Sequence, residues 1–187
     1  MKSQIVYNGY MCLSRKVFAH AKSVFEIDID FFKKNNVKVL MMDLDNTLDS
    51  YRLYEPTERS REFINKLIET DITPYIISNN KGKRVSSYAN SLGIGYLSSS
   101  CKPFAFKIKR LIKEKGWNED ELMMVGDQML TDIGMANKAN IRAILTDKIV
   151  KEDQWTTHFN RLFDRPMRKH YAKKGKLIDW RTLYGKD

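Results

Sequence analysis

From residue 37 onward, short apolar runs alternate with stretches of helical periodicity in this chain of 187 residues. The runs have the length of strands, and the stretches between them place apolar side chains at i, i+3, i+4 and i+7. Regular alternation of this kind favours a parallel, doubly wound sheet with helices on both faces. We therefore predict an α/β fold. Its strands are expected over residues 37–43, 73–77, 95–98, 122–125 and 141–145.

The same pattern divides the chain into three regions. Residues 37–150 form the predicted core domain, and residues 151–187 form a basic, aromatic C-terminal extension. Residues 1–36 precede the alternation. Their apolar spacing favours an amphipathic helix packed on the core, although a helix that lies on a membrane surface has a similar pattern. The residues that define this stripe are Val17, Phe18, Ala21, Val24 and Phe25.

Glycine and proline mark the limits of two predicted helices. Gly93 fits the C-terminal cap of the helix that follows the strand at 73–77. The next helix is expected to begin at Pro103, because proline is favoured in the first helical turn, and to end at Gly116. Its predicted apolar face consists of Phe104, Ile108, Leu111 and Ile112.

The composition is that of a soluble globular protein, with 42% hydrophobic and 30% charged residues. No apolar run approaches the ~20 residues that a membrane-spanning helix needs, and the N-terminus lacks the apolar core of a signal peptide. Two cysteines, Cys12 and Cys101, are too few for a disulfide framework or a zinc cluster. We therefore expect a cytoplasmic protein.

The net charge of +10 is concentrated near the C-terminus. Residues 161–187 contain nine Lys/Arg and three Asp/Glu, a difference of +6. Such an excess favours an anionic partner, either the inner face of a membrane, which the protein would contact peripherally, or nucleic acid. A solvated tail that only aids solubility is an equally good interpretation.

Two aspartates mark the end of the first predicted strand. Asp43 and Asp45 follow an apolar run and are two residues apart, so in an extended strand both point to the same side. Two crowded carboxylates repel each other unless a cation lies between them, and a hard divalent cation suits oxygen ligands. An ordinary turn is the alternative, since aspartate and asparagine are common at strand ends.

Polar residues also follow three other predicted strands. Ser78 ends the second, where its hydroxyl and the backbone N–H groups from Asn79 onward can bind an anion. Lys102 precedes Pro103, so it is predicted next to the start of a helix, where its charge is locally unfavourable and a function would explain it. Asp127 and Asp132 follow the fourth strand. Ligands of doubly wound sheets bind at this edge.

These four motifs resemble those of the haloacid dehalogenase (HAD) superfamily, in the same order and on the same kinds of element. The DxDxT motif begins at Asp43, the Ser/Thr motif is Ser78, the lysine motif is Lys102, and the acidic motif runs from Gly126 to Asp132. The resemblance covers about residues 37–146. It implies a Rossmann-like HAD fold and a phosphomonoesterase, since HAD ATPases carry threonine where this chain has its second aspartate.

The resemblance also implies a role for each residue. Asp43 would be the nucleophile that forms an aspartyl-phosphate, and Asp45 would be the general acid and base. Mg²⁺ would be bound by Asp43, Asp45 (through its backbone carbonyl), Asp127 and Asp132. The phosphoryl group would be held by Ser78, Asn79, Lys102 and Thr47.

The spacing of the motifs leaves no room for a large cap domain. There are 32 residues between Asp45 and Ser78 and 23 between Ser78 and Lys102, and one βα unit takes up most of each interval. The site is therefore expected to be open, which favours a large substrate over an enclosed metabolite. A partner subunit and a short flap at 49–56 are the other possible covers.

Within the superfamily, the chain resembles the capless subfamily IIIA and its YqeG-type group, through Ile27-Asp28-Ile29-Asp30 and the segment that begins at Val37. That group includes phosphatidylglycerophosphate phosphatases, and the basic tail suits a substrate in an anionic membrane. Two alternatives remain open at this point. One is a nucleic-acid or nucleotide phosphatase, and the other is a non-catalytic RNA- or ribosome-binding protein that has kept the fold.

Overall fold

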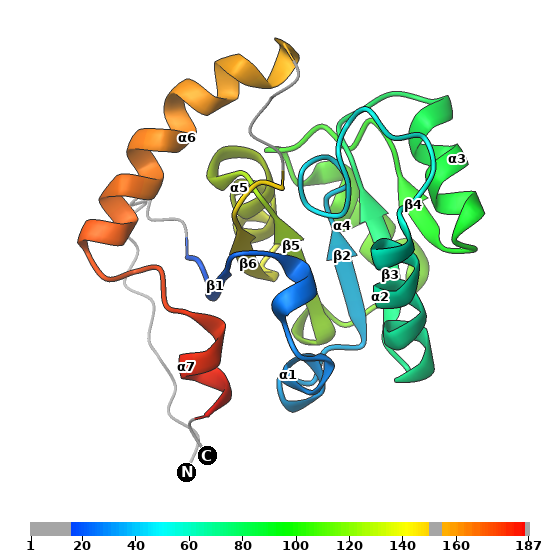
Figure 1. The fold of residues 1–187 in the computed structure, drawn as a ribbon, viewed down its shortest axis with the longest axis horizontal. Helices are drawn as coiled ribbons and strands as arrows, with labels where there is room; N and C mark the ends of the chain where they lie inside the picture. Colours follow the sequence, from blue (N-terminus) through cyan, green and yellow to red (C-terminus); the bar gives the residue numbers. More distant parts are fainter. Residues whose placement is uncertain (1–15, 150–154, 186–187) are drawn as a thin grey trace.

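The core of the protein is a six-stranded parallel sheet with helices on both faces (Figure 1). A computed structural model describes residues 16–149 and 155–185, and expectations for the other residues lie outside this range. The strand order is β1-β6-β5-β2-β3-β4. The strands are β1 Ala19–Ala21, β2 Val39–Met42, β3 Thr73–Ile77, β4 Gly95–Leu97, β5 Leu122–Gly126 and β6 Arg142–Thr146. All five predicted strands are present, and the predicted α/β class is confirmed.

Helices connect successive strands, and two more helices come after the last strand in the sequence. The α-helices are α1 Ile29–Lys34, α2 Glu58–Glu69, α3 Lys83–Ser91, α4 Phe106–Lys115, α5 Gly134–Lys138, α6 Trp155–Lys173 and α7 Trp180–Tyr184. Short 3-10 helices lie at η1 Val24–Glu26 and η2 Glu119–Glu121, and a π-helix lies at η3 Met129–Ile133. None of the helices that the structure describes is long and apolar enough to cross a bilayer.

Each strand supplies side chains to two separate apolar cores. In β2, Leu40 and Met42 pack on the face covered by α1, α2, α3 and α7, whereas Val39 and Met41 pack against α4, η3, α5 and Tyr171 of α6. Burial on both faces explains why the strands are continuous apolar runs and not alternating ones.

The register of β2 brings several loops to one edge of the sheet. Met42 is opposite Ile76 of β3 and Val125 of β5, so the residues that follow these strands emerge side by side. The chain runs outward from β2 through β3 to β4 and then returns to the other side of β2 with β5 and β6. This reversal beside β2 forms the crevice where doubly wound folds place their ligands.

The predicted amphipathic helix around Val17–Phe25 is wrong, because part of that segment is the edge strand β1. Ala19 and Ala21 are fully buried and pair in parallel with Ile144 and Thr146 of β6. A three-residue strand followed by the 3-10 helix η1 leaves apolar residues at positions that also fit a helical period. The pairing with β6, which is distant in the sequence, makes this segment a strand and not a helix.

The predicted start of the helix at Pro103 is also wrong, since α4 begins at Phe106 with Ala105 as its N-cap. Ser99 and Cys101 have positive φ angles of 48° and 63°, so the chain turns sharply before the helix. Phe104 is exposed, with Lys138 Nζ 5.3 Å from its ring centre, and is not part of the apolar face. Gly116 ends the helix in the left-handed conformation, as predicted.

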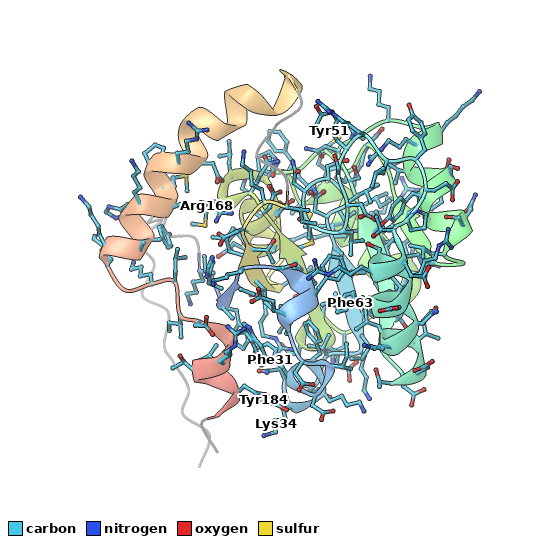
Figure 2. All side chains as sticks on the ribbon, in the orientation of Figure 1. Phe31, Lys34, Tyr51, Phe63, Arg168 and Tyr184 are labelled. Atoms are coloured by element: carbon cyan, nitrogen blue, oxygen red, sulfur yellow. The ribbon has the colours of Figure 1, made fainter. Side chains whose placement is uncertain are left out.

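The C-terminal extension is packed into the fold. Trp180 is buried, with its ring 5.7 Å from that of Phe31 and 5.8 Å from that of Tyr184. The N–H of His20 in β1 donates to the carbonyl of Ile178 at 2.7 Å. Figure 2 shows Phe31 and Tyr184 near each other where α1 meets α7. The extension therefore completes one edge of the core.

We expect Trp180→Ala to lower the free energy of unfolding by about 3 kcal/mol, because it leaves a large cavity beside Phe31. Urea denaturation followed by circular dichroism measures this. Ile178→Ala, at a side chain that is 41% exposed, is the control and should change stability by less than about 0.5 kcal/mol. Equal stability of the two variants would contradict the packing described.

Candidate active site

Asp43 lies at the carboxyl end of the central strand. Its N–H donates to the carbonyl of Val125 at 2.9 Å, so the pairing with β5 continues one residue beyond β2. The side chain is buried and accepts a hydrogen bond from Lys102 Nζ at 2.6 Å. The central strand thus holds a rigid, desolvated carboxylate at the crevice.

Lys102 reaches this carboxylate from the loop after β4. Its buried Nζ lies 2.6 Å from Asp43, 2.8 Å from Asp132 Oδ1 and 2.8 Å from the carbonyl of Ile77, to which it donates. The backbone of Lys102 is held by the Asn79 side chain, which accepts from its N–H at 2.7 Å and donates to its carbonyl at 2.8 Å. The lysine is therefore fixed at both its backbone and its tip.

These contacts change the interpretation of two predicted residues. Asn79 was expected to bind phosphate, but the structure places its side chain on the backbone of Lys102. Lys102 itself precedes the N-cap of α4 by three residues, so the argument from an unfavourable helix dipole does not apply to it. The carboxylates that face its ammonium explain its position instead.

The loop after β5 supplies two more buried carboxylates. Carboxylate oxygens of Asp43, Asp127 and Asp132 all lie within 4.8 Å of one another. Asp132 Oδ2 accepts from the N–H of Gln128 at 2.9 Å, which closes the loop on itself. Gly126 is required here, because a Cβ atom at this position would lie 2.4 Å from the side chain of Asp132.

Burial raises the pKa of Asp43 well above its ordinary value against the opposing effect of Lys102, and the carboxylates of Asp132, Asp45 and Asp127 raise it further. Burial alone would lower the pKa of Lys102, but Asp132 and Asp43 outweigh it, so this pKa is raised. Asp43 is thus easier to protonate than an ordinary aspartate, and the lysine stays protonated.

The site fits a divalent cation. Three buried carboxylates gather oxygen atoms in one small volume, and oxygen is the donor that hard divalent cations prefer. Lys102 Nζ lies within 2.8 Å of the carboxylates of Asp43 and Asp132. A cation bound by Asp43, Asp127 and Asp132 would add further positive charge among these buried carboxylates.

Asp45 lies beyond β2, in an isolated bridge with Asp49, so the strand that the spacing argument assumed does not extend to it, although its carboxylate still acts on Asp43. β2 ends at Met42, and Asn46 has a φ angle of 66°, which bends the chain immediately after Asp45. The Asp45 carboxylate lies 2.7 Å from Arg84 Nη1 and accepts from Asn80 Nδ2 at 2.6 Å. Its side chain therefore has separate partners, beside the three clustered carboxylates.

The pKa of Asp45 is raised by burial, although Arg84 and Lys102 oppose this effect. Asp45 therefore keeps its proton to a higher pH than an ordinary aspartate does, which suits a general acid.

Sequence reasoning missed Arg84, which connects Asp45 to the flap. This mostly buried arginine in α3 also donates from Nε to the carbonyl of Leu53 at 2.9 Å and from Nη2 to that of Ser50 at 3.1 Å. One signal was present in the sequence, because Arg84 is four residues before Tyr88 and therefore shares the apolar face of its helix. The acceptors, 31 to 39 residues away, give no such signal.

Two predicted hydroxyl residues lie at the same edge. Ser78 is buried after β3, and its Oγ accepts from the N–H of Asn80 at 3.1 Å, which leaves the hydroxyl proton available to a ligand. Thr47 is 1% exposed, and within the described part of the chain its hydroxyl makes no hydrogen bond. Both are chemically able to donate to a phosphate oxygen.

A lysine and two further carboxylates converge on the carboxylate at the end of the central strand. On a doubly wound sheet, this arrangement defines a hydrolase of the HAD type. Residues 100–165 match a family model described as HAD-hydrolase-like. The chain is 31% identical over 159 residues to the probable phosphatase YqeG of Bacillus subtilis, covering 85% of this chain and 92% of that protein. The chain therefore belongs to the YqeG family of HAD-type phosphatases, which are phosphoric monoester hydrolases.

Other relatives are more distant. Phosphatidylglycerophosphate phosphatase 1, chloroplastic/mitochondrial, of Arabidopsis thaliana is 26% identical over 166 residues, which cover 82% of this chain and 47% of that protein. A Vibrio cholerae protein proposed to be a 3-deoxy-D-manno-octulosonate 8-phosphate phosphatase has a similar fold, with a TM-score of 0.52 at 15% identity over 65% of this chain and 71% of its own. An uncharacterized protein of Listeria monocytogenes gives a TM-score of 0.50 at 16% identity, covering 63% and 85%.

We expect Arg84→Met to lower the free energy of unfolding by about 3 kcal/mol, because it leaves the Asp45 carboxylate without its cationic partner and releases the flap. Chemical denaturation measures the change. Lys83→Met, at the exposed neighbouring residue of α3, is the control and should stay within about 0.5 kcal/mol of the natural protein. If the two variants were equally stable, Arg84 would not have this role.

Proposed function

We propose that this protein uses Mg²⁺ to hydrolyse the terminal phosphate of phosphatidylglycerophosphate, through an aspartyl-phosphate on Asp43. The observation that carries the chemistry is the buried contact of Asp43 with Lys102, with Asp127 and Asp132 beside it. Such an arrangement suits phosphoryl transfer, because catalysis there depends on position and charge. Burying these charges together is costly in desolvation, and a reaction at the site would explain why the chain carries them.

In the proposed reaction, an Asp43 carboxylate oxygen attacks phosphorus while the lipid oxygen leaves. Lys102 faces the attacking carboxylate and stabilises negative charge on the phosphoryl oxygens, with Ser78 and Thr47 as further donors. A Mg²⁺ ion held by Asp43, Asp127 and Asp132 would supply additional positive charge to the phosphoryl group.

Asp45 is proposed to move the protons. It donates a proton to the leaving oxygen, and it then takes one from the water that hydrolyses the aspartyl-phosphate. Arg84 and Asn80 hold its two carboxylate oxygens at 2.7 and 2.6 Å, so its orientation is defined. The products are the dephosphorylated lipid, inorganic phosphate and the regenerated Asp43.

The open site supports a large substrate. Residues 16–149 are described without a gap, and within them short loops, but no inserted domain, connect β2, β3, β4 and β5 near the carboxylates. The flap after β2 exposes Leu53 and Tyr54, which are 38% and 64% accessible. A lipid headgroup presented by a membrane could approach this edge directly. The name of the Arabidopsis relative adds independent support for the same substrate.

We expect Asp43→Asn to abolish Mg²⁺-dependent release of phosphate from p-nitrophenyl phosphate, because an amide cannot act as the nucleophile. Asp120→Asn, at an exposed residue on the opposite edge of the sheet, is the matched control and should retain activity. Equal, complete inactivity of the natural protein and Asp43→Asn over a broad set of phosphate esters would favour the non-catalytic alternative.

The substrate is tested by comparing phosphate release from phosphatidylglycerophosphate vesicles and from a 3′-phosphorylated oligonucleotide. We expect a kcat/KM at least ~10-fold higher for the lipid, measured with the same enzyme and Mg²⁺ concentration. A preference for the oligonucleotide would replace the proposed substrate and leave the HAD chemistry intact.

Peripheral attachment to an anionic membrane is the proposed role of the exposed charge in the second half of α6 and at Lys174, the residue after it. Arg165, Lys169, Lys173 and Lys174 are exposed, and each can contribute ~1 kcal/mol near an anionic surface. We expect their joint replacement by glutamine to release the protein from phosphatidylglycerol vesicles in a sedimentation assay. Substitution is preferable to truncation, which would also remove buried Trp180.

The matched control replaces three exposed lysines of α4, Lys109, Lys113 and Lys115, by glutamine. We expect this control to remain bound. If both variants were released equally, general charge and not α6 would be responsible, and if neither were released, the attachment would lie elsewhere.

A further inference from the structure

The loop that carries Asp127 and Asp132 is attached to the C-terminal extension. We propose that Asp164 and Arg168 of α6 are positioning residues that hold this loop in its metal-binding conformation. The inference rests on the proposed cation site, and it makes the extension a part of the active site. Figure 2 shows Arg168 between α6 and the sheet.

Asp164 caps the π-helix that contains Asp132. Its carboxylate is 1% exposed, and Oδ1 accepts from the N–H of Met129 at 2.5 Å and of Leu130 at 3.3 Å. These are the first N–H groups of η3, whose own N-cap residue, Gln128, provides no side-chain cap. The first N–H groups of a helix need such an acceptor. It is supplied here by a residue more than 30 positions away.

Arg168 connects the ends of two strands. Its Nη2 donates to the backbone carbonyls of Asp127 and Thr146, the latter at 2.6 Å, and therefore joins the residue after β5 to the last residue of β6. Its Nε donates to Asp164 at 3.0 Å and its Nη1 to Asp147 at 3.1 Å. A planar guanidinium can make these contacts together, because its donors are fixed in one fork.

Asp147, the more exposed of the two carboxylates that bind Arg168, is itself held by a hydrogen bond. His20 of β1 lies 3.2 Å from Asp147, and this hydrogen bond lowers the pKa of Asp147, with Arg168 adding to the effect. The arginine is thus fixed by two carboxylates while it binds two carbonyls.

The two residues restrain both ends of the ligand loop. Arg168 fixes the backbone of Asp127, and Asp164 fixes the start of the turn that leads to Asp132. Because the side chains of Asp127 and Asp132 repel each other before a cation arrives, an unrestrained loop would separate them. Groups that orient metal ligands typically change metal affinity by ~10–100-fold when removed.

The test is direct binding of Mn²⁺, as a probe for the cation, to the full-length protein, followed by electron paramagnetic resonance. We expect Arg168→Met to raise the Kd for Mn²⁺ by about 10-fold, because methionine keeps part of the stem and lacks every donor. With p-nitrophenyl phosphate, the KM for Mg²⁺ should rise by a similar factor while the KM for the ester stays within about 2-fold. Arg110→Met, at an exposed arginine of α4, is the control and should bind Mn²⁺ like the natural protein.

A purely structural role predicts a different result. Arg168→Met would then be less stable but, once folded, would bind Mn²⁺ with the natural Kd, and this outcome would overturn the inference. If Arg168→Met does not fold, Arg168→Lys is measured in the same way. Lysine keeps the positive charge beside Asp147 and Asp164 but lacks the planar set of guanidinium donors, so we expect a several-fold higher Kd for Mn²⁺. An unchanged Kd would again overturn the inference.

These measurements separate the inference from the proposed substrate. A natural protein that binds Mn²⁺ and cleaves p-nitrophenyl phosphate, but not phosphatidylglycerophosphate, would refute the substrate alone. A natural protein that binds no divalent cation would refute the cation site and the inference together.

Discussion

The active-site half of the molecule depends on one buried ammonium group. Lys102 Nζ joins the carboxylate after β2, the carboxylate in the loop after β5 and the carbonyl of Ile77 at the end of β3. Three neighbouring strands and the loop after β4 therefore converge on a single charge. Removing one partner of such a group costs several kcal/mol, because the remaining charges stay buried. The site is consequently as much a structural centre as a chemical one.

Much of the fold could be predicted because its signals are local. The five core strands are apolar on both faces, and turns and glycines mark their ends, so periodicity alone identifies them. The four motifs lie directly after these strands, and parallel register then brings Asp43, Lys102, Asp127 and Asp132 together. Local pattern and global fold agree in this part of the chain.

The features that sequence reasoning missed depend on distant partners. β1 is a strand only because β6 lies beside it, and the chain before α4 is a loop because Lys102 turns into the carboxylate cluster. In the sequence Arg168 looks like an ordinary surface arginine, and Arg84 differs only in sharing the apolar face of its helix with Tyr88. Their acceptors are mostly backbone carbonyls, 22 to 41 residues away. Because every residue has a backbone carbonyl, the sequence does not reveal which ones accept these hydrogen bonds.

The contact between His20 and Ile178 has a consequence for how the protein is made. β1 belongs to the first elements of the chain, yet residues 178 and 179 near the C-terminus cover its outer edge. During synthesis β1 can form only after β6 has left the ribosome, and its outer edge then stays unpaired until residues 178 and 179 follow. β1 is only three residues long, which limits the pairing that it offers to other nascent chains. The short strand can thus be understood as protection during the interval before the two ends of the chain meet.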